Sequence, residues 1–107
     1  MPGRNILELD ANRDVDGSNA FESSFANMHI DELMLEFDPK HSGPPVAVLG
    51  NTGGGTKELH PAPLRGRDGR FSATVGGQEA WSSIRITMAR GMKGKLMKVK
   101  LIGKPPA

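Results

Sequence analysis

The stretch that decides the fold is Ala80–Ile102, AWSSIRITMARGMKGKLMKVKLI, which reads as two strands joined by a tight turn. Apolar and polar residues alternate over Ile84–Met88 and again over Leu96–Ile102, and a period of two turns one set toward a core. Two glycines between the runs permit the positive φ angles of a tight connection. The stretch therefore predicts a β-hairpin, and because an isolated hairpin is marginal in water, its apolar face must cover further strands.

The outer face of this hairpin is basic. One interpretation is a binding patch for phosphate backbones or for an acidic protein surface. The alternative, which we favour, is a solubilising face that also discourages edge-to-edge aggregation, since no aromatic residues interleave to stack bases. The residues in question are Arg85, Arg90, Lys93, Lys95, Lys98 and Lys100.

Length and composition indicate one small domain rich in turns. The chain has 107 residues, with 14 Gly and 8 Pro, which favours a loop-rich β domain over a helical bundle. The absence of Cys excludes disulfides, thiolate zinc sites and cysteine nucleophiles. The first residues lack the apolar core of a signal peptide, and no run reaches transmembrane length, so we expect a protein made in the cytoplasm without a membrane partner.

Charge is distributed unevenly along the chain. Residues 1–40 carry three basic and nine acidic side chains, a net charge of −6, whereas residues 41–107 carry eleven and three, a net charge of +8. Such asymmetry predicts either head-to-tail contact between copies or an acidic N-terminal arm lying on a basic body. Self-association with other subunits is therefore one expectation.

The N-terminal third is predicted to be an arm. Asn5–Leu9 reads as a short strand, and Asp10–Asn19 is polar and turn-prone. Within it, Asn12–Gly17 resembles the first half of an EF-hand calcium loop, but Ser23 stands where the bidentate Glu is needed. We favour a polar arm or turn over calcium binding.

Ala20–His29 allows two interpretations. Phe21, Phe25 and Met28 recur at helical spacing, and Asn19 with Glu22 resembles a capping box, which predicts one short helix docked on the β body. Alternatively, the two Phe side chains anchor an extended arm on another subunit. We favour an ordinary core role for this aromatic pair.

The rest of the chain reads as strands and turns. Trp81 is a candidate core anchor, and Asp68-Gly69 is a standard hairpin signal. The glycine-rich stretch Gly50–Lys57 resembles a phosphate loop but lacks the helix that must follow it, so a hairpin loop is favoured. Predicted strands lie within His29–Asp38, where Leu33, Leu35 and Phe37 alternate with polar or exposed positions, and at Val46–Leu49 and Phe71–Val75.

No catalytic constellation is evident. The three His residues, His29, His41 and His60, lack the close pairing of a metal-binding helix, and His29 with Asp31 would need further ligands. No serine has the context of a nucleophile elbow. We therefore predict a protein that is not an enzyme, with no cofactor, metal or catalytic residues.

These patterns predict an all-β fold, a small antiparallel β-sandwich or barrel of six or seven strands. The expected division is an arm over residues 1–27, where a short helix is one alternative, a β domain over residues 28–103 and a tail over residues 104–107. A cysteine-free β body behind a Gly/Asn/Ser-containing arm resembles the small cement, or decoration, proteins of tailed-bacteriophage capsids.

The resemblance implies a structural protein on the virion surface that binds major capsid protein across subunit junctions and stabilises the shell. Phe21 and Phe25, or the Gly50–Gly55 loop, would then make contacts, and the basic hairpin would meet an acidic capsid surface. The alternative is a nucleic-acid-binding barrel that uses Arg65, Arg67, Arg70, Arg85 and the Lys93–Lys100 cluster. A third hypothesis is a calcium-stabilised adhesive module.

Overall fold

The computed structural model describes residues 5–38, 45–59, 65–75, 79–88 and 91–104. These residues form eight β-strands and no helix, so the predicted all-β class is confirmed. No helix among them could cross a membrane. The strands are β1 (Asn5–Asp16), β2 (Phe21–Phe37), β3 (Pro45–Thr52), β4 (Gly55–Glu58), β5 (Arg65–Arg67), β6 (Arg70–Thr74), β7 (Trp81–Met88) and β8 (Lys93–Lys104).

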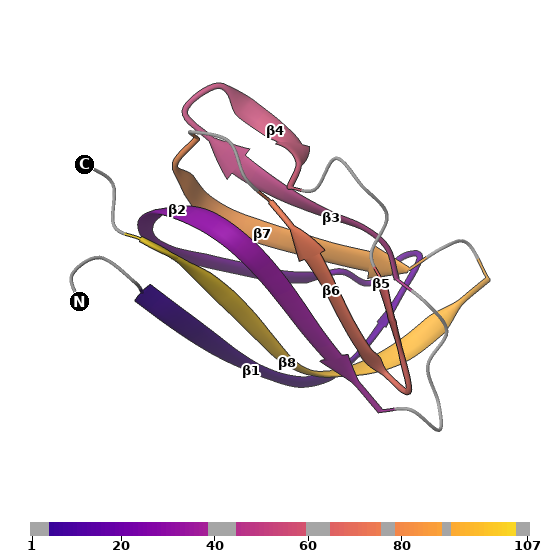
Figure 1. The fold of residues 1–107 in the computed structure, drawn as a ribbon. Helices are drawn as coiled ribbons and strands as arrows, with labels where there is room; N and C mark the ends of the chain where they lie inside the picture. Colours follow the sequence, from indigo (N-terminus) through magenta and orange to yellow (C-terminus); the bar gives the residue numbers. More distant parts are fainter. Residues whose placement is uncertain (1–4, 39–44, 60–64, 76–78, 89–90, 105–107) are drawn as a thin grey trace.

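The strands form one curled antiparallel sheet in the order β1-β8-β2-β7-β3-β4. The 17-residue strand β2 belongs to two layers, because Phe21–Met28 pairs with β7 whereas His29–Phe37 pairs with β8 on one side and with β6 on the other. Figure 1 shows β2 curling from one layer into the other. We call β1, β8, the C-terminal part of β2, β6 and β5 sheet A, and the N-terminal part of β2, β7, β3 and β4 sheet B.

The core lies between the layers and is built by period-two alternation. From Ile30 to Phe37 on β2, buried residues alternate with less buried ones except at a bulge near Asp31. Trp81 is buried in this core, which confirms the prediction that it is an anchor. The largest fully buried side chains are Trp81, Phe37, Ile30, Leu33, Ile84, Ile86, Leu96, Leu101, Val15, Val48 and Val99.

The predicted hairpin of residues 80–102 is right in its strands and wrong in their pairing. Both runs form strands, β7 and β8, but among the described residues they do not pair, because β2 lies between them in the sheet order. Their apolar residues enter one core cluster from different sheets. Alternation along a strand indicates which face is buried but not which strand lies beside it. Here the long strand β2 pairs with both β7 and β8.

The helix considered for Ala20–His29 is wrong, because Phe21–His29 is part of strand β2. Phe21 lies opposite Ile86 and Met28 opposite Trp81, with an irregularity in the register between Ser24 and Met28. The irregularity shifts the phase of the alternation, so Phe21 and Met28 are both buried although they are seven positions apart. A phase shift of this kind imitates helical spacing in the sequence.

Within the predicted N-terminal arm, the strand expected at Asn5–Leu9 is confirmed and extends further, since β1 spans Asn5–Asp16 and pairs with β8. The Asp68-Gly69 hairpin is confirmed, since both residues have positive φ angles, 55° and 81°, as a tight two-residue turn requires. The favoured hairpin at Gly50–Lys57 is confirmed by the pairing of β3 with β4. Arg90, His41 and His60 lie outside the described residues.

Candidate interaction surface

The lysines of β8 that sequence reasoning assigned to a partner face carboxylates of the same chain. Directly opposite residues on neighbouring strands lie on the same side of the sheet, close enough for their side chains to interact. The acidic N-terminal strand thus lies along the basic C-terminal strand. The facing pairs are Asp16 with Lys93, Asp14 with Lys95, Asp10 with Lys98, and Glu8 with Lys100.

Glu8 is the centre of this pairing. Its Oε1 lies 3.3 Å from Nζ of Lys100, and its Oε2 lies 3.8 Å from Nζ of Lys98. All three side chains are partly exposed, so each ion pair contributes about 0–1 kcal/mol to stability. Their main effect is on the surface field, because two of the predicted binding lysines have a carboxylate beside them. Of the two outcomes expected from the charge asymmetry, an acidic segment on a basic body is therefore present within one chain.

Alternating charge continues across sheet A. One row runs from Asp10 through Lys98 and Glu36 to Arg70, and neighbours in it differ in sign at every step. The adjacent row has the exposed Met34, with 41% of its surface accessible, between Lys100 and Ser72. A groove of about 340 Å³ follows these rows and is lined by Glu8, Met34, Leu35, Glu36, Gly66, Arg70, Phe71, Ser72, Lys98 and Lys100.

The predicted basic residues do not form one patch. Arg85 lies on β7 in sheet B, where its Nε is 3.2 Å from Oε1 of Glu22 on β2. The four lysines lie on β8 in sheet A, so the separation follows from the insertion of β2 between these strands. Phe21 is buried and Phe25 packs against the core, which confirms the core interpretation of this pair. Neither phenyl ring lies on an open arm.

Sheet B presents a polar row that sequence reasoning missed. Ser24, Ser83, Asn51 and Thr56 stand opposite one another across four strands, and the hydroxyl of Thr56 donates a hydrogen bond to Oδ1 of Asn51. A second groove of about 340 Å³ runs beside this row. Nothing in the sequence indicates the row, because its members come from strands whose pairing is set by the whole fold.

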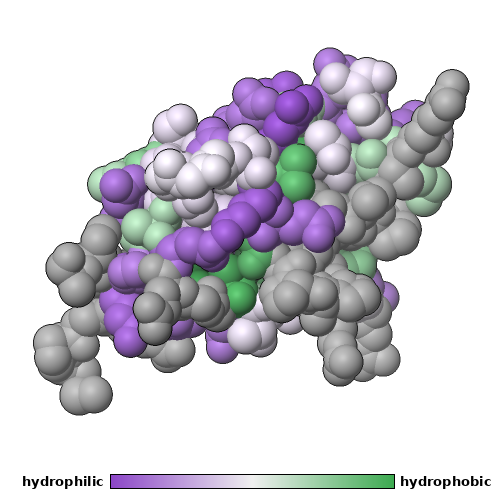
Figure 2. Space-filling model, turned by 90° about the horizontal axis from the view of Figure 1, so that it is seen from above, coloured by the Kyte–Doolittle hydropathy of each residue, from purple (hydrophilic) through white to green (hydrophobic). Residues whose placement is uncertain are grey.

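The surface is mainly hydrophilic on the side seen in Figure 2. Hydrophobic residues reach it there only in small, separate areas. Among the described residues, the large exposed apolar side chains are those of Ile6, Met34 and Met92. Scattered residues of this kind do not form a broad apolar interface.

The calcium-like segment is not a loop. Asn12–Asp16 is the end of β1, and the side chain of Val15 is fully buried in the core. Asp16 instead holds the β1–β2 turn, since its Oδ1 accepts hydrogen bonds of 2.7 Å from the backbone N–H groups of Ser18 and Asn19. These bonds lower the pKa of the Asp16 carboxyl below its usual value of 3.8, and the bond from Asn19 has the larger effect.

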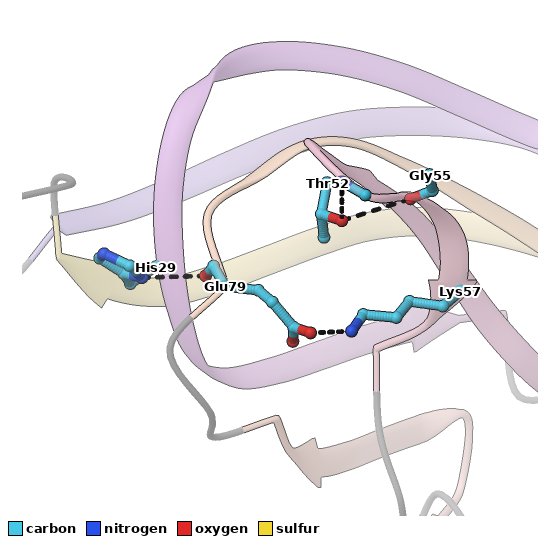
Figure 3. Close-up of polar contacts among 6 residues, drawn as sticks. His29, Thr52, Gly55, Lys57 and Glu79 are labelled. Carbon is cyan, nitrogen blue, oxygen red and sulfur yellow. Dashed lines mark hydrogen bonds and ion pairs between the residues drawn. The ribbon is translucent and has the colours of Figure 1, made fainter.

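The remaining candidate motifs are explained by local contacts (Figure 3). Nδ1 of His29 lies 2.9 Å from the carbonyl oxygen of Glu79, and the Glu79 carboxylate forms an ion pair with Lys57. In the glycine-rich turn, Oγ1 of Thr52 accepts a 3.0 Å hydrogen bond from the backbone N–H of Gly54. Within the described parts of the chain, no three His, Asp or Glu residues are grouped to hold a metal ion.

The comparison with solved structures finds a distant likeness. No protein-family model and no curated protein matches the sequence. Among solved structures, the chain is similar to the "Crystal structure of serine protease of Aeromonas sobria", with 13% identity and a TM-score of 0.48. The match covers 96% of this chain and 28% of that one, so this chain spans little more than a quarter of the protease. A likeness of this degree carries no argument about activity.

Proposed function

We propose that the protein is a non-enzymatic structural protein that binds other protein subunits. In its specific form, the proposal is a cement protein that sits across capsid-subunit junctions of a tailed bacteriophage and stabilises the shell. Support comes from the surface chemistry: the exposed groups of the described residues include ion pairs, hydroxyls and isolated apolar side chains. Such surfaces suit protein contacts with a polar rim.

The pairing of β1 with β8 is the observation that carries this proposal. A nucleic-acid site needs cations free to replace the counterions of phosphates. Here Lys98 and Lys100 share the carboxylate of Glu8, and Arg85 is bound to Glu22 in the other sheet. These contacts make the nucleic-acid alternative weaker and favour recognition of a protein.

The first experiment measures molar mass by light scattering after size exclusion at low and high salt, with absorbance recorded at 260 and 280 nm. We expect protein free of nucleic acid in both salts. Bound nucleic acid that high salt removes would overturn the proposal in favour of the nucleic-acid alternative.

The specific form requires a shell. Shells assembled from the major capsid protein encoded in the same genome are sedimented with and without this protein. We expect saturable co-sedimentation and a higher melting temperature of the decorated shell. A genome without such a capsid protein, or shells that leave the protein in the supernatant, would overturn the capsid form.

A further inference from the structure

Strand β1 lies at a border of sheet A. Among the strands that the structure describes, it pairs with β8 alone, and Figure 1 shows it as the outermost strand on its side. The backbone N–H and C=O groups on the other side of such a strand are available to pair with a further strand from another chain.

The apolar side of β1 is incompletely covered. Leu7 and Leu9 pack against the core but remain partly exposed, whereas their partners on β8, Leu101 and Val99, are fully buried. On the opposite side of the sheet, Ile6 leaves 61% of its surface accessible. A strand placed beside β1 would cover all three side chains, and burial of apolar surface would favour its binding.

The outward side of β1 is acidic in the part that precedes the register irregularity, between Asn5 and Asp10. Asp10 ends the row of alternating charge that crosses sheet A, Glu8 ends the adjacent row, and each faces a lysine of β8 on one side. A cation on the other side would continue the alternation by one more strand. Opposite charges at facing positions stabilise neighbouring strands, and like charges there are unfavourable.

The chain itself limits the length of strand that could pair here. The register with β8 is irregular between Asp10 and Arg13, and Asn12 within this bulge has a φ angle of 47°. The exposed Arg13 follows directly. Bulges and charges of this kind interrupt edge pairing, so the regular stretch is Asn5–Asp10, which we call the edge segment.

We propose that the edge segment binds an extended basic strand of the partner protein, by adding that strand to sheet A. This inference rests on the proposed function and names its surface and the chemistry of its partner. Facing Asp10, Leu9, Glu8, Leu7 and Ile6 in turn, an antiparallel strand needs the pattern basic, apolar, basic, apolar, apolar.

The protein's own β8 has this pattern. Lys98–Ile102, KVKLI, faces the edge segment from the other side in that register. A second copy cannot supply its β8 without unfolding, because that strand lies between β1 and β2. The occupant is therefore a segment of a different protein with the same alternation.

The test uses the whole protein and a synthetic peptide with the sequence of residues 96–103, LMKVKLIG. Binding is followed by nuclear magnetic resonance, with hydrogen exchange of the backbone amides as the readout. We expect protection of amides in the edge segment without faster exchange in β8. A peptide with both lysines replaced by glutamate, and one with N-methylated backbone groups, should each bind at least about tenfold more weakly.

Two double variants of the protein test whether the carboxylates of the edge segment contribute to peptide affinity. The double variant Glu8→Gln with Asp10→Asn is expected to weaken binding about tenfold. The control pair, Glu32→Gln with Glu58→Gln, removes two exposed carboxylates away from β1 and should leave affinity unchanged. The melting temperature of each variant is measured, and the N-methylated peptide tests the same contact on the unaltered protein.

Three results would overturn the inference. These are no binding at peptide concentrations up to about 1 mM, binding that N-methylation does not weaken, and faster exchange in β8, which would mean displacement of that strand. Shell binding without peptide binding would refute this inference alone. Peptide binding without shell binding would refute only the capsid form of the proposed function.

Discussion

At the scale of single residues, the fold depends on positions where the backbone lies so close to other groups that a side chain would not fit. Composition does not reveal which positions these are. Gly50 is one of fourteen glycines and is buried against Trp81 and Leu59, whereas Gly53, three residues later, has open space where a Cβ would lie. The sequence places both in one glycine-rich run. Only the surroundings of β3, which pairs with β7, distinguish the buried Gly50 from the turn residue Gly53.

Replacing Gly50 with alanine should destabilise the protein by about 1–3 kcal/mol. The added Cβ would lie 2.7 Å from Cε3 of Trp81 and 2.8 Å from the carbonyl oxygen of Ser83, so the core must shift. Gly53→Ala is the matched control and should change stability by less than about 0.5 kcal/mol, since nothing lies within 4 Å of its Cβ. Urea unfolding checks both, and equal stability of the two variants would contradict the packing argument.

Asp16 makes the stability of the protein depend on pH. Its folded pKa is lowered, so its ionised form stabilises the fold above the unfolded value near 3.8, and this contribution is lost as pH falls through the lower folded value. In Asp16→Asn, residue 16 no longer titrates. The difference in unfolding free energy between wild type and variant should therefore be larger above pH 3.8 than well below it. A difference independent of pH would contradict the role assigned to the two backbone hydrogen bonds.

At the scale of elements, the sequence predicts strands well and their neighbours poorly. Alternation located most of β7 and β8, and the Asp68-Gly69 signal located the turn between β5 and β6. Pairing was not predictable, because an apolar stripe specifies that a face is buried but not which strand lies beside it. Because the register is irregular between Ser24 and Met28, the apolar residues in the N-terminal part of β2 recur in the sequence at the spacing of a helix.

The candidate interaction surface, too, could be predicted only where it depends on the sequence of a segment and not on strand pairing. The alternative of an acidic segment on a basic body came from the charge of whole segments, which the sequence displays. The facing of Glu8 with Lys100 requires the register of β1 on β8. The row from Ser24 to Thr56 draws on four strands, so no local pattern contains it.

Removal of residues 1–16 should unfold or strongly destabilise the protein. Deletion takes away the fully buried Val15 and the contacts of Leu7 and Leu9, and it exposes the side of β8 that now pairs with β1. We expect a loss of at least about 4 kcal/mol from these side chains, measured by thermal melting followed by circular dichroism. A truncated chain that melts like the complete one would show that β1 is a dispensable arm.

At the scale of the whole molecule, the first and last described strands are neighbours. Asn5 lies opposite Gly103, so the two ends of the described chain meet at one end of sheet A, as Figure 1 shows. The acidic and basic parts of the sequence thus come together within one molecule. A chain that looks strongly polarised in sequence therefore has an interleaved surface on this sheet.

A circularly permuted chain should fold. Facing residues in antiparallel strands have Cα atoms only about 5 Å apart, so Ala107 can be joined directly to Met1, with new ends opened in the turn between Gly53 and Gly54. We expect a melting temperature close to that of the original protein, measured by calorimetry. The matched permutant, opened between Ser83 and Ile84 in the middle of β7, should not fold, and its folding would contradict the pairing of β7 with both β2 and β3.

The position of β8 has a consequence for synthesis on the ribosome. It is the last strand of the sequence described, yet it lies inside the sheet, between the first strand and the second. While the chain is being made, β1 has no neighbour to pair with, and the layer that contains it cannot close. The pairing of β1 must therefore wait until Lys104 has left the exit tunnel, whereas the N-terminal part of β2, β7, β3 and β4 can pair before that point.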